Sequence, residues 1–283
     1  MNIFLTGGTG FIGSHLLRLL GTTSHKVNAL RRGASQPCID IGIAPVWIEK
    51  QMDELQLSDL MGVDVLVHLA SVGVSPKTAS WHDLFHWNVL GMLDLLEKAH
   101  AAGVKRFVLA GSFAEYGISA NKYDFIPVDA PLLPTSPYAA SKAAGFIAAN
   151  TFAIEKQLEL CYLRIFSAYG EGQYINNFWP ALRAAAMSGD DFEMTPGGQV
   201  RDFVPVESVA KALLSSIESK SIVTTKEPFV ANIGSGYPMS MLEFAEKCWA
   251  EWGATGRIIA GAKSYRPNEP MRYVPLISKA MNR

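Results

Sequence analysis

Three glycines near the amino terminus constrain the fold more than any other feature of this sequence. Gly7, Gly10 and Gly13 follow a short apolar run, Ile3–Leu5, and open an amphipathic helical pattern. In a strand–turn–helix unit, glycines at this spacing permit a sharp turn, a close approach of backbone to a pyrophosphate, and tight packing of helix on strand. The free N–H groups of the helix N-terminus then face the phosphates. We therefore predict a dinucleotide site built from Gly7, Gly10, Phe11, Ile12 and Gly13.

Short apolar strands alternate with helical patterns over the first 170 residues. The expected strands are Ile3–Leu5, Val27–Leu30, Asp64–Leu69, Arg106–Ala110 and Glu159–Ile165, and the expected helices are Phe11–Leu20, Phe85–Ala101 and Tyr138–Ile154. This alternation is typical of βαβ units, which build a parallel sheet with both faces covered. The fold class that we predict is α/β, with a Rossmann-type doubly wound parallel sheet.

The alternation loosens after residue 170. Helical patterns cover 181–188, 206–219 and 241–252, Phe229–Ile233 has the pattern of a strand, and the segment 265–275 holds three prolines. We expect a dinucleotide-binding domain over residues 1–170, to which segments within about 203–235 return. Residues 171–283 then form a smaller, mixed substrate-binding region.

Composition excludes several classes of protein. The chain has 283 residues, a net charge of −1, 49% hydrophobic and 18% charged residues, which argues against disorder and against a nucleic-acid or membrane partner. Its three cysteines are widely spaced and no signal peptide precedes the glycines, so we expect a cytoplasmic protein. His82 and His86 lack a third ligand, so no metal site is expected, and His68 is expected to be a core histidine.

Two arginines follow the second predicted strand. An acidic residue at this place would bind the 2′-hydroxyl of an NAD ribose, whereas arginine accommodates the 2′-phosphate of NADP. The sequence has Arg31 and Arg32 here and no acid. We predict NADP as the cofactor, with NAD as the alternative. The other interpretation of the two arginines is an ordinary solvated basic loop.

A tyrosine and a lysine four residues apart are candidates for proton transfer. Tyr138 and Lys142 share one face of a predicted helix, and a nearby ammonium lowers the pKa of a phenol. Such a tyrosine can exchange a proton with an alcohol or carbonyl oxygen. Ser112 follows a predicted strand at its carboxyl end, where α/β sites form. Alone, each of these residues is also compatible with a solvated face or a helix cap.

Taken in order, these motifs resemble the extended short-chain dehydrogenases/reductases of the NAD-dependent epimerase/dehydratase family, which modify nucleotide sugars. The resemblance extends over nearly the whole chain. Its motifs are the glycine turn, Val67–Ala70, Asn88–Gly91, Gly103–Val108, Ser112 with Tyr116–Gly117, Tyr138 with Lys142, Leu163–Arg164 with Tyr169–Gln173, and Arg201–Val204.

The resemblance implies a role for each matching residue. Tyr138 is the expected general acid/base, Lys142 tunes it and binds the nicotinamide ribose, and Ser112 donates a hydrogen bond to the reacting oxygen. Further cofactor contacts are expected at Leu69 and Ala70, and the stretch 71–80 is expected beside the nicotinamide. Substrate contacts are expected at Ser112, Ser167, Asn177, Arg201 and Arg266. A homodimer formed through the two long helices is implied as well.

Departures from the family pattern select the reaction. Phe113 and Ala114 stand where the dehydratases carry acids, and Glu115, one place later, is expected to face away. A dehydratase is therefore disfavoured. Since a reductase consumes NADPH, Arg31 and Arg32 favour reduction of a 4-keto nucleotide sugar. An NAD-dependent 4-epimerase is the alternative, and a catalytically idle dinucleotide sensor is a third hypothesis.

Overall fold

A seven-stranded parallel sheet forms the centre of the molecule. The computed structural model describes residues 1–219, 227–266 and 269–277. In spatial order the strands are β3 (Val46–Glu49), β2 (Lys26–Arg31), β1 (Asn2–Thr6), β4 (Val65–His68), β5 (Arg106–Ser112), β6 (Glu159–Ile165) and β10 (Phe229–Ile233). The order reverses between β1 and β4. This confirms the predicted doubly wound, Rossmann-type sheet.

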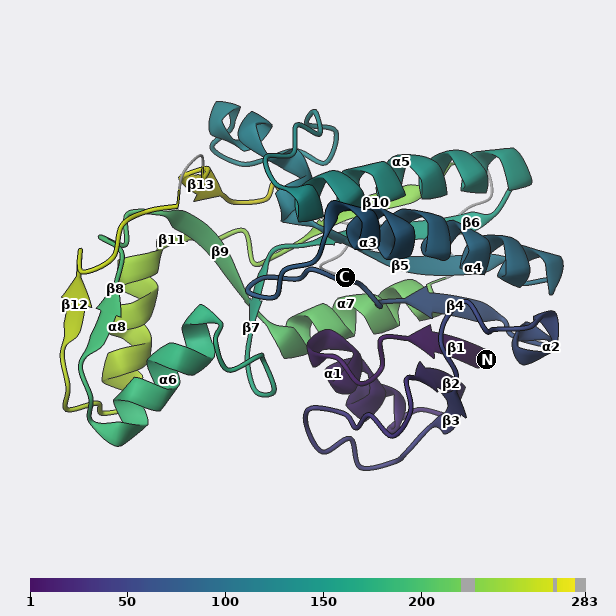
Figure 1. Ribbon diagram of the computed structural model, residues 1–283, viewed down its shortest axis with the longest axis horizontal. Coiled ribbons are helices and arrows are strands. Elements are labelled where there is room, and N and C mark those ends of the chain that lie inside the picture. Colours follow the sequence, from purple (N-terminus) through teal and green to yellow (C-terminus); the bar gives the residue numbers. More distant parts are fainter. Residues whose placement is uncertain (220–226, 267–268, 278–283) are drawn as a thin grey trace.

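Helices cover both faces of this sheet (Figure 1). One face carries α3 (Trp81–Phe85), α4 (Gly91–Ala101) and α5 (Pro137–Lys156), and the other carries α1 (Phe11–Leu20) and α7 (Val206–Glu218). A short helix, α2 (Leu57–Leu60), packs against α4. Each face has its own apolar core, because β1, β4, β5 and β6 are buried on both sides.

The long helix before β5 begins earlier than its apolar pattern predicts. Ser80 caps it by accepting a hydrogen bond from the backbone N–H of Asp83 at 3.0 Å, so the helix starts at Trp81 and not at Phe85. Between α3 and α4 the residues His86–Leu90 form a π-helical turn, η1. The buried Asn88 lies in this turn, and π-turns are frequent at functional sites.

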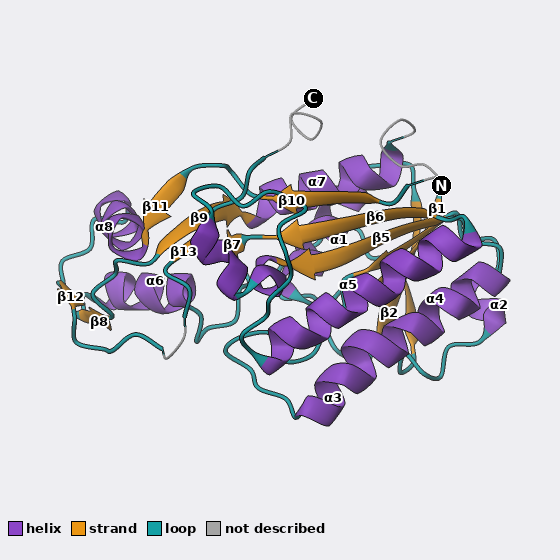
Figure 2. Ribbon diagram, turned by 90° about the horizontal axis from the view of Figure 1, so that it is seen from above, coloured by secondary structure: helices purple, strands orange, loops and turns teal. Residues whose placement is uncertain are grey.

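A smaller layer lies beyond the carboxyl ends of β5 and β6, towards which the arrowheads of these strands point in Figure 2. Its sheet contains β7 (Ser167–Tyr169), β9 (Val200–Pro205), β11 (Pro238–Ser240) and β13 (Arg272–Tyr273). Helices α6 (Phe178–Ser188) and α8 (Met241–Glu251) and the strand pair β8 (Phe192–Met194) and β12 (Ile258–Ala260) complete it. Between β9 and β11 the chain returns to the large sheet through α7, which packs on α1, and through β10.

In the described ranges, no helix combines the length and the apolar composition needed to cross a membrane.

Candidate active site

The glycine turn lies at the carboxyl edge of the sheet, between β1 and α1. Gly7 has a φ of +76°, and a Cβ there would lie 2.6 Å from the backbone nitrogen of Ala70. A Cβ on Gly13 would lie 2.1 Å from the carbonyl oxygen of Gly7. Gly10 caps α1 without a side chain, and the first turn of α1 carries no acidic residue. No capping side chain and no first-turn carboxylate therefore competes for the N–H groups at this N-terminus, which fits the pyrophosphate of a dinucleotide.

The end of β2 carries an ion pair that the sequence does not reveal. Arg31 hydrogen-bonds to Glu49 at the end of the neighbouring strand β3, and its guanidinium lies 5.1 Å from the ring centroid of Trp47. Arg32 is exposed. The end of β2 itself carries no acid, as read from the sequence, but β3 brings the carboxylate of Glu49 to Arg31. That short edge strand is half-exposed and lacks a buried apolar pattern.

Ser112, Tyr138 and Lys142 come together at the carboxyl end of β5. Ser112 ends β5, and Pro137 places Tyr138 in the first turn of α5 after the Ser136 cap. The hydroxyls of Ser112 and Ser71 lie near the phenol of Tyr138 and lower its pKa. Lys142 donates from Nζ to the carbonyl oxygen of Ala110 at 2.6 Å. This arrangement can deliver a proton to an oxygen placed between Ser112 and Tyr138.

The phenol of Tyr138 is not acidified in this setting. Burial, and after it the negative charge of Glu115, raise the pKa of Tyr138 to about 12, and the nearby hydroxyls of Ser112 and Ser71 oppose the rise. Burial lowers the pKa of Lys142, against the influence of Glu115. The Tyr138 pKa is therefore not lowered as expected, because burial and the charge of Glu115 outweigh the influences that lower it.

Asn88, to which no role was assigned from the sequence, supports this centre. Asn88 accepts from the backbone N–H of Val72 at 2.9 Å, and it donates to the carbonyl of Val72 at 3.1 Å and to Ser141 at 3.0 Å. Its Oδ1 also lies 3.1 Å from the hydroxyl of Ser71. Asn88 thus fixes the segment after β4, which brings Ser71 near Tyr138. The sequence signal that could have pointed to Asn88 is its place in the Asn88–Gly91 motif.

His68 is buried at the end of β4, as expected for a core histidine. Its Nδ1 lies 2.7 Å from the hydroxyl of Thr6 on β1. Burial, with a smaller contribution from the charge of Lys142, lowers the pKa of His68 to about 3. The imidazole is therefore neutral at physiological pH. Leu69 and Ala70, which follow it, pack against Gly7 and so lie beside the glycine turn.

Glu115 lies behind Ser112 and is fully buried. Its Oε1 accepts from the backbone N–H of Ser112 at 2.7 Å and from the hydroxyl of Tyr162 at 2.8 Å. Its Oε2 accepts from Nε of Arg164 at 2.7 Å. Glu115 thus points into the protein between β5 and β6, while Phe113 packs edge-on against Tyr273 with ring centroids 4.8 Å apart.

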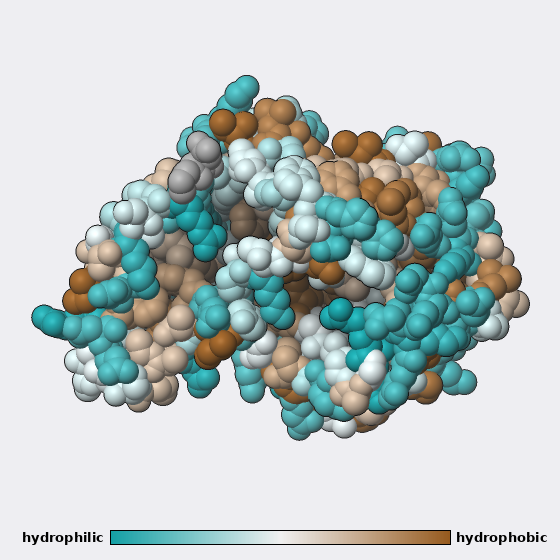
Figure 3. Space-filling view, in the orientation of Figure 1, coloured by the Kyte–Doolittle hydropathy of each residue, from teal (hydrophilic) through white to brown (hydrophobic). Residues whose placement is uncertain are grey.

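The substrate candidates lie on the smaller layer and beside it. Figure 3 shows a hollow between this layer and the large sheet. A cavity of about 260 Å³ adjoins α6 and is lined in part by Gly172, Trp179 and Arg183. Ser167 begins β7, and Asn177 is the N-cap of α6, with no side-chain hydrogen bond of the capping type.

The two arginines expected to bind phosphate differ in their surroundings. Arg201 is buried and donates to the carboxylate of Glu269 at 2.9 Å and to the carbonyls of Val200 and Pro270, each at 3.0 Å. Arg266 is exposed. Of the two, Arg266 offers the freely accessible guanidinium, and Arg201 is engaged by a carboxylate.

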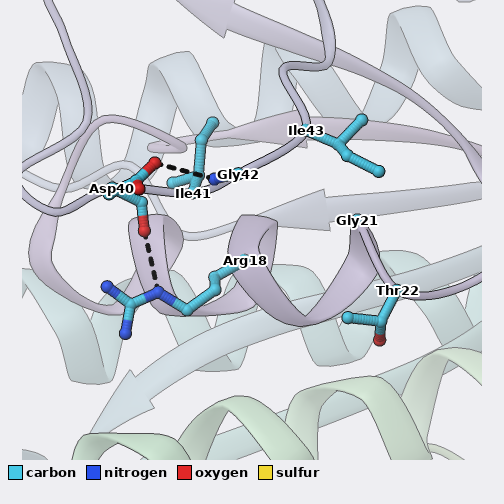
Figure 4. A pocket seen from close by; sticks show the side chains of 7 residues that line it. All are labelled: Arg18, Gly21, Thr22, Asp40, Ile41, Gly42 and Ile43. Carbon is cyan, nitrogen blue, oxygen red and sulfur yellow. Dashed lines mark hydrogen bonds between the residues drawn. The ribbon is translucent and has the colours of Figure 1, made fainter.

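A second depression, of about 330 Å³, lies at the opposite end of α1 (Figure 4). There Arg18 donates from Nε to the carbonyl of Asp40 at 2.8 Å, and the Asp40 carboxylate accepts from the N–H of Gly42 at 2.9 Å. These internal bonds satisfy the polar groups, and the depression lies far from Ser112 and Tyr138. Within the described ranges, no group of three or more histidine, cysteine or acidic side chains is arranged to hold a metal ion.

Comparisons with known proteins agree with this geometry. The chain is 30% identical to MoeE5, whose structure holds UDP-glucuronic acid and NAD, with a TM-score of 0.86 over 100% of this chain and 92% of that one. It is 28% identical to a UDP-glucose 4-epimerase from Corynebacterium glutamicum, over 88% of this chain and 79% of the relative. It is 27% identical to a dTDP-6-deoxy-L-talose 4-dehydrogenase (NAD(+)) from Aggregatibacter actinomycetemcomitans, over 89% and 90% of the respective chains. The profile of the NAD dependent epimerase/dehydratase family matches residues 3–234, and the chain belongs to that family.

Proposed function

We propose that this protein reduces the 4-keto group of a nucleotide-activated sugar with NADPH. The observation that carries the proposal is the grouping of Ser112, Tyr138 and Lys142 at the carboxyl edge of a dinucleotide-type sheet, while the Glu115 carboxylate is bonded to Tyr162 and Arg164. The nicotinamide of the bound cofactor would supply the hydride that C4 receives.

The chain's own residues would orient the sugar and move the proton. Ser112 would hydrogen-bond the carbonyl oxygen, and Tyr138 would donate its phenolic proton to that oxygen as it becomes a hydroxyl. A high pKa suits a proton donor, since the phenol remains protonated until it is needed. Lys142, held to β5 by Ala110, has further N–H donors with which to bind the nicotinamide ribose.

The absence of an acid beside Ser112 supports reduction over dehydration. Elimination of water requires a base and an acid near C5 and C6 of the sugar. Phe113 occupies the position after Ser112 and packs on Tyr273, and the Glu115 carboxylate is bound to Arg164. Neither residue supplies those groups.

The choice of NADPH rests on Arg31 and Arg32 at the end of β2. Arginine binds phosphate oxygens through a planar set of donors, and the exposed Arg32 is free to reach a 2′-phosphate. NAD is the second candidate, because Glu49 brings a carboxylate to the same corner and because MoeE5 was solved with NAD.

We infer that the nucleotide sugar binds in the hollow between the two layers. Asn177 and Arg266 would bind its pyrophosphate, and Ser167 would contact the sugar. Arg201 would contribute a phosphate contact only if Glu269 gives up its bond to the guanidinium. A nucleotide-sugar substrate is supported by MoeE5, which binds UDP-glucuronic acid.

A 4-epimerase is the alternative, favoured by the similarity to UDP-glucose 4-epimerases, and it would use the same three residues. Incubation with 4-keto and 4-hydroxy nucleotide sugars, with NADPH or NADH, separates these functions. Stoichiometric loss of NADPH with a keto sugar supports the reductase. Isomerisation of a 4-hydroxy sugar without net change of cofactor would replace it by the epimerase. Cofactor binding without either reaction would favour the idle sensor.

We further propose a cytoplasmic homodimer. Apolar side chains are exposed along α3–α4 and α5, among them Trp81, Leu90, Ile147 and Ile154, and Figure 3 shows apolar patches over α5. A second copy of the same two helices would cover them. The free cysteines suit a reducing compartment. Sedimentation of the purified protein tests the dimer, and a monomer at micromolar concentration would contradict it.

A further inference from the structure

A buried ion pair lies directly behind the catalytic serine. Arg164 on β6 is 1% exposed and Glu115 is not exposed at all. Isolating an ion pair from water costs several kcal/mol for each ion, which only good geometry and further hydrogen bonds offset. Here the geometry is good, because each oxygen of Glu115 accepts at least one hydrogen bond shorter than 3 Å. A pair this costly, placed at this point, calls for an explanation beyond stability.

The pair is connected to the backbone of the active site. Glu115 accepts from the N–H of Ser112 and the Ser112 side chain accepts from the N–H of Glu115, in a capping box; Ser112 also accepts from the N–H of Ala114 at 3.2 Å. The Ser112 side chain is therefore held by a short 3₁₀ turn whose geometry depends on the Glu115 carboxylate. Gly111 makes room for this arrangement, because a Cβ there would lie 2.8 Å from Glu115 Oε1 and 2.2 Å from the Tyr162 ring.

Arg164 is anchored independently of Glu115. Its guanidinium donates from Nη1 to the carbonyl of Val128 at 3.0 Å and lies 4.3 Å from the ring centroid of Phe146. Tyr116 lies 3.3 Å from the same Nη1 and donates to Asn232 on β10 at 2.6 Å. The counter-ion of Glu115 is thus held by groups from α5 and the segment after β5, and through Tyr116 it is linked to β10.

We propose that Glu115 is a positioning residue of the reaction centre, which fixes the Ser112 hydroxyl and maintains a negative charge behind Tyr138 and Lys142, with Arg164 as its anchor. The inference rests on the proposed proton transfer by Tyr138. The titratable groups that act on one another in this centre, besides Tyr138, are Glu115 on the turn after β5, Lys142 on α5, His68 on β4, and Tyr162 and Arg164 on β6. Burial raises the pKa of Glu115, and the charges of Arg164 and Lys142 oppose this rise.

Two consequences follow for the variant Glu115→Gln, which keeps the shape and removes the charge. The pKa of Tyr138 falls, because Glu115 raises it in the native protein, so the donor loses its proton at lower pH. The alkaline limb of kcat for reduction then moves down by about one pH unit. A displaced Ser112 also lowers kcat about tenfold, while KM for the nucleotide sugar stays within about twofold.

Glu159→Gln is the matched control. Glu159 pairs with Arg106 at 2.7 Å across the same two strands, β5 and β6, at their amino ends, away from Ser112. It is expected to lower the melting temperature without moving the pH profile. If Glu115→Gln fails to fold, the double variant Glu115→Gln/Arg164→Gln, which leaves no unpaired charge, replaces it with the same expected direction of shift.

A titration of the phenol tests the inference without any substrate. Tyrosinate absorption in the ultraviolet is followed for the native protein and for Glu115→Gln, each minus its Tyr138→Phe counterpart, within the pH range where circular dichroism stays native. We expect ionisation of Tyr138 at lower pH in Glu115→Gln. A folded Glu115→Gln protein with the native titration and the native pH profile would overturn the inference. Absence of the titration shift would overturn the role of Glu115. Failure of the proposed function is a separate outcome, because the native protein would then be inactive with every keto sugar.

Discussion

Lys142 donates a hydrogen bond from Nζ to the carbonyl oxygen of Ala110, two residues before Ser112, at 2.6 Å. This contact ties α5 to the end of β5, so the helix that carries Tyr138 is held in register with the strand that carries Ser112. An ammonium has three donors, and one is committed here. Lys142 therefore has a structural function at the site as well as the proposed contact with the cofactor.

Lys142→Met is expected to lower kcat/KM about a hundredfold and to weaken NADPH binding, because both the anchor to β5 and the ribose contact are lost. Lys156→Met, at the other end of α5, is the control, since Lys156 pairs only with exposed Glu155 among the described contacts. Steady-state kinetics and fluorescence titration with NADPH measure the effect. Equal effects of the two variants would contradict the assignment.

Tyr138→Phe is expected to lower kcat by a factor of about 10² to 10⁴, since it removes the proton donor. The ring remains, so the fold and the melting temperature should change little. Tyr123→Phe, on the segment after β5, is the matched control and should retain the native rate. A Tyr138→Phe protein with full activity would exclude the mechanism.

Gly13→Ala tests the glycine turn. The new Cβ would lie 2.1 Å from the Gly7 carbonyl oxygen, so the helix must move away from the strand, at a cost of about 1–3 kcal/mol in the free energy of unfolding. Dinucleotide binding should weaken as well. Gly21→Ala, at the end of the same helix, has helical φ and ψ and a nearest contact of 3.3 Å, and should leave binding unchanged. Chemical denaturation and a cofactor titration distinguish the two variants.

Arg32→Ala should raise KM for NADPH by about tenfold or more and leave KM for NADH unchanged, because hydrogen bonds between charged groups contribute about 1.5–3 kcal/mol. Lys26→Ala, at the opposite end of β2, is the control. If the native protein prefers NADH, then the Arg31–Glu49 pair binds the adenosine ribose in another way and the NADP assignment fails.

His68 predicts how stability depends on pH. Its folded-state pKa of about 3 lies below its usual value of 6.5, so only the unfolded state takes up a proton between these values. Stability is therefore lost as the pH falls, by about 3 kcal/mol between pH 6.5 and pH 4 from this group. His68→Gln should reduce this acid-dependent loss, whereas His82→Gln, at an exposed position, should not. Identical urea midpoints against pH for all three proteins would refute the interpretation.

The elements that the sequence predicted well are those with a strong apolar signal. Residues 159–165 and 229–233 form strands with the bounds expected, because both strands are largely buried. The edge strand β3 was missed because Val46 and Glu49 are exposed, and the short strands of the second sheet were missed because each has only two to six residues. Periodicity over so few positions carries little information.

The candidate site was also predicted only in part. The motif spacing predicted that Ser112, Tyr138 and Lys142 lie together, since parallel strands and the helices after them meet at one edge. It did not predict the Arg31–Glu49 pair or the Arg201–Glu269 pair, because their partners come from elements 18 and 68 residues away in the chain. Nor did it predict the raised pKa of Tyr138, which depends on burial and on Glu115.

The return of the chain to the large sheet as β10 has a consequence for how this protein can be divided. Strand β6 is hydrogen-bonded on both sides, by β5 and by β10, and α7 covers α1. A fragment that stops near residue 170 would expose the edge of β6 and the apolar side of α1, and such edges aggregate. The large sheet and the smaller layer are therefore interwoven along the chain, and recombining either part with that of a relative will require exchange of several separate segments.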